Sequence, residues 1–148
     1  MKKVFIINLG IIFFILISLE FVANFFKLSD LRGIEKGLIN TNHPIHKMIP
    51  ESSGIQFGKR IFIDKYGFRS PHENYKYNNN NDSVFIIGDS VTFGNGVEEN
   101  KIFIGKLRNE FENINFYNTA VPGYNIKHFK YNLKEIDNFK NIKKIFYF

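Results

Sequence analysis

The chain of 148 residues contains no cysteine, no tryptophan and only four prolines. The absence of cysteine excludes a disulfide framework and a thiolate zinc site, and it fits an exported protein as well as a cytosolic one. The lysines behind the formal charge of +6 are scattered, with no run longer than the pairs Lys2-Lys3 and Lys143-Lys144. Because no basic cluster or nucleic-acid motif is present, we expect no nucleic-acid partner.

One long apolar run is present, at the N-terminus. It extends over residues 4–26, with Glu20 and Asn24 near its far end. As a helix this run would rise about 35 Å, enough to cross the roughly 30 Å hydrocarbon core of a bilayer. We therefore predict that residues 1–26 form a single-pass transmembrane segment and that the membrane is a partner of the chain.

The flanks of this run indicate a retained signal anchor. Lys2 and Lys3 favour an N-terminus inside and a soluble part outside, periplasmic or extracellular, although Lys27 and Arg32 on the other side weaken that orientation. A cleaved signal peptide would need an A-x-A-like pattern of small residues, and Ala23 is the one such residue near its end. A cleaved signal peptide and a buried helix of a soluble protein remain the alternatives.

Residues 27–82 give weak signals, and we interpret them as a linker and lead-in segment. Residues 28–40 favour a short helix, residues 61–64 a short strand, and residues 75–82, with four consecutive asparagines, a solvated loop. His43 and His46 are three apart, but Pro44 lies between them and no further ligand-type residue is clustered nearby. We expect no metal site there.

From residue 83 onward, short apolar runs alternate with amphipathic segments. This pattern predicts a parallel sheet covered by helices on both faces, a three-layer α/β/α fold of flavodoxin-like type. The expected strands are Ser83–Ile87, Ile114–Asn118 and Lys143–Phe148, and the expected helices are Lys101–Asn113 and Ile126–Phe139. Ligands bind such sheets at the carboxyl ends of the strands, where the glycine-bearing loops 88–100 and 119–125 fall.

The loop after the first of these strands carries the main chemical signal. Ser90 comes just past the strand end, at the entry to a tight turn. A serine held there can aim its hydroxyl at a substrate and offer its own N–H to a developing oxyanion. Nearby glycines let the backbone bend and a substrate approach closely.

These residues resemble the motifs of the SGNH/GDSL hydrolase family. The segment VFIIGDSVTFGNGV over residues 84–97 is similar to the family's first block, and residues 118–124, NTAVPGY, are similar to its second. Residues 66–69, YGFR, look like a segment that often precedes the first block in membrane-anchored members. The resemblance covers roughly residues 63–148, so we expect residues 83–148 to be the N-terminal portion of such a domain.

The resemblance implies a serine ester hydrolase without a cofactor. Ser90 would be the nucleophile, the backbone N–H groups of Ser90 and Gly123 would be two of three oxyanion donors, and Asp89 would organise the turn. The family's third donor, an asparagine after the third strand, and its Asp-x-x-His block do not occur in this sequence. We therefore expect an incomplete domain, either a fragment or a truncated product, that is inactive or nearly so. An ester of a lipid or an acetylated glycan would be its substrate.

Three rival interpretations involve other classes of protein. A HAD-type phosphatase would use Asp89 as nucleophile, but it needs a second acid where Val91 stands. A dinucleotide-binding loop would need a third glycine where Glu99 stands. A membrane-anchored binding module with the same fold and no catalytic base stays open as the main alternative.

Overall fold

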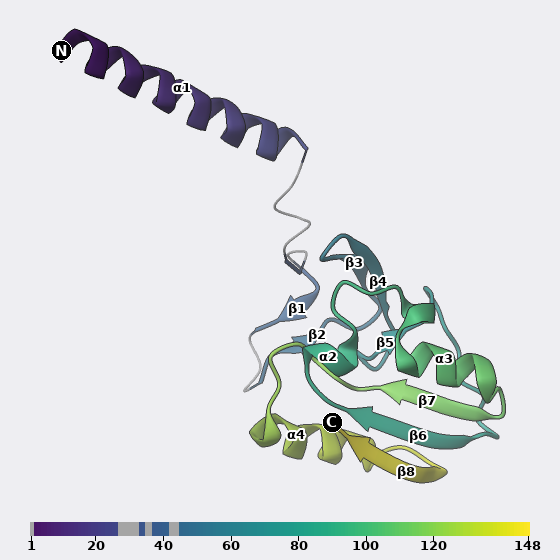
Figure 1. Cartoon of the computed structure of the whole chain (residues 1–148). Coiled ribbons are helices and arrows are strands. Elements are labelled where there is room, and N and C mark those ends of the chain that lie inside the picture. The colour runs from purple at the N-terminus through teal and green to yellow at the C-terminus, as the bar shows by residue number, and fades with distance from the viewer. Residues whose placement is uncertain (1, 27–32, 35–36, 42–44) are drawn as a thin grey trace.

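The computed structural model describes residues 2–26, 33–34, 37–41 and 45–148. The first helix, α1, extends over Lys2–Phe25 and projects away from the rest of the chain (Figure 1). Its apolar side chains are exposed, and the stretch Lys3–Phe25 is long and apolar enough to cross a membrane. Such a helix has nothing to bury its surface except lipid or another helix. The flanking residues Lys27 and Arg32 lie outside the described residues.

The remainder is a mixed α/β unit built on a six-stranded sheet (Figure 1). In spatial order its strands are β3 (Ser53–Gln56), β4 (Lys59–Ile63), β5 (Arg69–Ser70), β7 (Ile114–Asn118), β6 (Asp82–Ile87) and β8 (Ile142–Tyr147). The strands β7, β6 and β8 are mutually parallel, whereas β3, β4 and β5 run antiparallel to their neighbours. A separate two-stranded hairpin joins β1 (Ile39–Asn40) to β2 (Lys47–Met48).

The parallel part of the sheet is covered on both faces because β6 alternates its apolar side chains between them. Val84 and Ile86 pack with Ile104 of α3 (Phe103–Glu110). Phe85 and Ile87 pack with residues of α4 (Ile126–Ile136) on the opposite face. Two shorter elements precede α3, the four-residue helix α2 (Ser90–Phe93) and the 3₁₀ turn η2 (Glu99–Lys101).

The prediction of a parallel sheet is wrong in one respect, because the same sheet also contains antiparallel strands. The additional antiparallel strands come from residues 53–70, which the sequence led us to assign to the linker and lead-in segment. They join the parallel strands through a single register pair, Arg69 opposite Asn118. Tyr77, in the expected solvated loop, stacks on Tyr117 with ring centroids 3.9 Å apart. The helix expected over residues 28–40 falls largely outside the described residues, and its described end is strand β1.

A buried apolar cluster connects the lead-in segment to the loops at the carboxyl ends of the parallel strands. Its members come from the β1–β2 hairpin, from β4, from α2 and from the loop after β7: Leu38, Ile45, Met48, Ile61, Ile63, Phe93, Ala120, Val121 and Tyr124. Burial of about nine such side chains gives this region a core of its own. The described residues of the β1–β2 hairpin and of β4 are therefore part of the folded unit.

We predict that Ile61→Ala lowers the free energy of unfolding by about 2–4 kcal/mol, because it leaves a cavity in this cluster. Ile61 is 1% exposed, and Ile126, which is 69% exposed, offers a matched control. Urea unfolding of the full chain in detergent can be followed by tyrosine near-UV circular dichroism, since all seven tyrosines lie beyond residue 65. Equal unfolding curves for Ile61→Ala and Ile126→Ala would show that this segment is a linker.

Candidate active site

The carboxyl ends of β6, β7 and β8 meet at one edge of the sheet. On one side of β6, the Val121 N–H donates to the Gly88 carbonyl at 3.2 Å. On the other side, the Phe148 N–H donates to the Ile87 carbonyl at 3.1 Å. The turn that follows β6 is thus flanked by the loop after β7 and by the end of β8.

Asp89 shapes the turn at this edge. It has extended backbone, and its carboxylate accepts the N–H of Val91 at 2.9 Å, which caps helix α2. Gly88 permits the tight packing just before it, because a Cβ at that position would lie 2.2 Å from the Thr92 hydroxyl oxygen. Asp89 and Gly88 together fix the backbone at the start of α2.

Ser90 is the first residue of α2, and its side chain is half-buried. Its carbonyl accepts the N–H groups of Gly94 and Asn95, each at 3.1 Å. Its own N–H and its hydroxyl have no hydrogen-bond partner among the residues that the structure describes. Both remain available to a substrate oxygen and a substrate carbonyl carbon, respectively.

The loop after β7 leaves a second backbone donor available. The Ala120 N–H donates to the Asn118 side chain at 3.3 Å, and the Tyr124 N–H donates to the Val121 carbonyl at 3.1 Å. The Gly123 N–H has no partner in the described part of the chain. The φ of Gly123 is 84°, a left-handed value that favours glycine.

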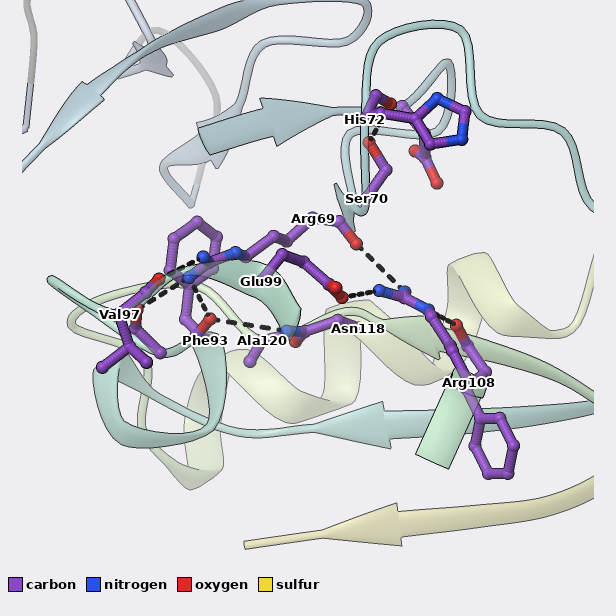
Figure 2. Close-up of polar contacts among 12 residues, drawn as sticks. Arg69, Ser70, His72, Phe93, Val97, Glu99, Arg108, Asn118 and Ala120 are labelled. Atoms are coloured by element: carbon purple, nitrogen blue, oxygen red, sulfur yellow. Dashed lines mark hydrogen bonds and ion pairs between the residues drawn. The ribbon is translucent and has the colours of Figure 1, made fainter. Parts of the chain in front are cut away.

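The far end of α2 is held by the buried side chain of Arg69, as Figure 2 shows. The Arg69 guanidinium donates to the carbonyls of Phe93 and Gly94, both at 2.7 Å, and of Val97 at 2.5 Å. These are the carbonyls that a helix end and the following turn leave without intrahelical partners. Asp89 therefore stabilises the start of α2, and Arg69 stabilises its end.

A second arginine supports the first. Arg108 donates to the Phe116 carbonyl at 2.9 Å and to the Arg69 carbonyl at 3.2 Å, and it forms an ion pair with Glu99 (Figure 2). Burial lowers the pKa of Arg69 to about 10, against the attraction of Glu99 and with the repulsion of Arg108. Arg69 is therefore charged at neutral pH, and its bonds to the carbonyls are charge-assisted.

His46 and His128 lie side by side, with ring centroids 5.9 Å apart, whereas His72 lies elsewhere. His72 is exposed and contacts the Glu73 carbonyl, and His128 completes the N-terminal cap of α4. His43 lies outside the described residues. His46 contacts the Pro122 carbonyl beside Gly123, a placement that the sequence analysis missed. Among the described residues, no three histidine, aspartate or glutamate side chains are grouped as metal ligands would be.

A cavity of about 700 Å³ lies elsewhere, at the opposite ends of the strands. Aromatic rings and amides line it, among them Tyr66, Phe139, Ser83 and Asn115. One of its polar side chains is already satisfied, since Asn115 exchanges hydrogen bonds with the backbone of Asn78. We place the candidate site at Ser90, where the polar groups are available, rather than at this cavity.

We expect Arg69→Lys to lower the free energy of unfolding by about 3 kcal/mol, because a single ammonium cannot replace the guanidinium fork and leaves a buried carbonyl unpaired. Arg60→Lys, at an exposed position of β4, is the matched control. Urea unfolding followed by tyrosine near-UV circular dichroism measures both. A stability loss no larger than that of the control would contradict the role given to Arg69.

Comparison of the chain with protein-family models, with curated proteins and with solved structures finds no match.

Proposed function

We propose that this chain carries the nucleophile and two oxyanion donors of a membrane-tethered serine ester hydrolase of the SGNH/GDSL type. This proposal is supported most directly by three polar groups at the carboxyl ends of the parallel strands that have no hydrogen-bond partner among the described residues. These are the hydroxyl and N–H of Ser90 and the N–H of Gly123. Loops joined by a backbone hydrogen bond, from Val121 to Gly88, present all three.

The chemistry follows from these groups. The Ser90 oxygen attacks the ester carbonyl, the carbonyl oxygen becomes an oxyanion, and the two N–H groups stabilise its charge. The oxyanion exists only during the reaction, so donors that are fixed in advance lower the barrier. The serine proton must pass to a base, which the SGNH family takes from its Asp-x-x-His motif.

The arrangement of the parallel strands supports the finer fold assignment. The order β7-β6-β8, with α3 and α4 on opposite faces, corresponds to the order 2-1-3 that begins a flavodoxin-like sheet. The antiparallel strands extend this core at one edge, and Arg69 of the YGFR segment brings them to the Ser90 turn. This contact gives the lead-in segment a physical role in the proposed site.

The N-terminal helix and the resemblance to the SGNH family together limit the range of expected substrates. We propose that α1 anchors the chain and that Lys2 and Lys3 keep its N-terminus inside, so that the catalytic unit faces the periplasm or the exterior. An acetylated envelope glycan or a lipid ester is the substrate class that such a tether brings within reach. This step is an analogy with the family.

The sequence also favours a second candidate. None of the five aspartates is followed by histidine at the third position, so no Asp-x-x-His motif occurs in these 148 residues. A fold with the oxyanion donors and without this base would bind an acyl ester or acetylated glycan and not turn it over. Saturable binding of an acetylated oligosaccharide without transfer of its acetyl group to Ser90 would favour this binding module.

We predict that p-nitrophenyl acetate acetylates Ser90 in the full chain in detergent, and that turnover is slow because the loss of a base costs several orders of magnitude. Peptide mass spectrometry locates the acetyl group. Ser90→Ala should remove it, and Gly123→Ala should slow it at least about tenfold by displacing one donor. Exposed Ser53 provides the background rate. Acetylation of Ser90 no faster than of Ser53 would contradict the proposal.

A further inference from the structure

His46 is bonded to the one peptide group whose orientation decides where the Gly123 N–H points. Its ring nitrogen Nε2 lies 2.7 Å from the Pro122 carbonyl oxygen. A carbonyl oxygen accepts only, so Nε2 carries the proton and donates it. The Pro122 carbonyl and the Gly123 N–H belong to the same peptide unit.

That peptide unit is planar and trans, since the described chain has no cis peptide bond. In a trans unit the C=O and the N–H point in opposite directions. With the Pro122 carbonyl fixed on His46, the Gly123 N–H is therefore fixed in the direction away from His46. This is the N–H that no described group accepts.

Residues 121–124 form the kind of turn in which this peptide can flip. The Tyr124 N–H donates to the Val121 carbonyl at 3.1 Å, Pro122 and Gly123 occupy the central positions, and the φ of Gly123 is 84°. These are the features of a type II turn. A type I turn differs by rotation of the central peptide, and proline followed by glycine is compatible with both backbones. Without a further contact, the Pro122–Gly123 peptide could therefore rotate, and the Gly123 N–H would then point in the opposite direction.

We propose that His46 is a positioning residue, which selects the type II turn and thereby aims the Gly123 N–H at the oxyanion. The role of Gly123 as an oxyanion donor rests on the proposed function of Ser90. The stabilisation of the turn by His46 rests on the geometry alone. His46 acts through the Pro122–Gly123 peptide and does not contact the substrate.

His46 is itself held firmly enough to do this. The Tyr124 hydroxyl donates to the His46 carbonyl at 2.7 Å, and the two rings make an edge contact with centroids 5.1 Å apart. The neighbours Ile45 and Met48 are buried in the apolar cluster that includes Val121 and Tyr124. The described residues of the β1–β2 hairpin thus form one side of the candidate site.

The variants His46→Phe and His46→Gln distinguish the effect of the hydrogen bond to Pro122 from the effect of ring packing against Tyr124. Phenylalanine keeps a ring against Tyr124 and removes the donor, whereas glutamine keeps an N–H donor. His128→Gln is the control for ring packing around His46: the His128 ring stacks on the same Tyr124 ring at 4.9 Å and lies 5.9 Å from the His46 ring, and glutamine can retain its capping role.

The first readout is the turn itself, measured by NMR on the full chain in detergent micelles. A strong NOE between the Pro122 Hα and the Gly123 amide proton marks a type II turn and weakens in a type I turn. We expect this NOE in the parent chain, its weakening in His46→Phe, and its recovery in His46→Gln. An undiminished NOE in His46→Phe would overturn the proposal.

The second readout is the acetylation rate of Ser90, expected to fall about tenfold or more in His46→Phe, toward the 10²–10³-fold cost of losing one oxyanion donor. His46→Gln should recover most of that rate, and His128→Gln should keep it. A weakened NOE with an unchanged rate would overturn the link to the oxyanion. Absence of Ser90 acetylation in the parent chain would instead contradict the proposed hydrolase function, while the NOE result still decides whether His46 holds the turn.

Discussion

The guanidinium of Arg69, fully buried and bonded to three backbone carbonyls, is the constraint on which the site depends. A buried cation is costly unless hydrogen bonds compensate it, so the turn cannot leave Arg69 without a large penalty. Asp89 satisfies an N–H at the start of α2, and Arg69 satisfies the carbonyls at its end. Between these two anchors, the N–H and the hydroxyl of Ser90 are left without a partner among the described residues.

Three stretches of chain supply the parts of this arrangement. Strand β5 contributes Arg69, the loops after the parallel strands contribute Ser90 and Gly123, and the β1–β2 hairpin contributes His46. One apolar cluster, with Leu38, Ile61 and Val121 among its members, packs all three together. The candidate site is therefore not a property of the Gly-Asp-Ser motif alone, since the backbone around that motif is held by residues distant in sequence.

The parts that the sequence predicts well are those with a local cause. Strands Asp82–Ile87 and Ile114–Asn118 match the expected ranges within one residue. The apolar run Val84–Ile87 ends at Gly88, and the second strand, rich in apolar and aromatic residues, lies between two helical patterns. Strand β4 was expected in part, over residues 61–64, but β3, β5 and the antiparallel pairing were missed. Strand β5 is two residues long and joins β7 through one register pair, which leaves no periodic pattern. His46 was missed because its contact with Pro122 depends on the docking of a segment 76 residues away. Arg69 could have been suspected, as a single charge between aromatic and turn residues in YGFR.

The most direct test of the central claim is whether the Ser90 and Gly123 N–H groups bind one oxyanion together. Phenylboronic acid adds to a serine oxygen to give a tetrahedral anion that resembles the intermediate of ester hydrolysis, and boron NMR distinguishes it from the trigonal acid. We expect a tetrahedral adduct in the full chain, with the amide protons of Ser90 and Gly123 shifting together, and no adduct in Ser90→Ala. Boron that stays trigonal, or an adduct that moves neither amide, would contradict it.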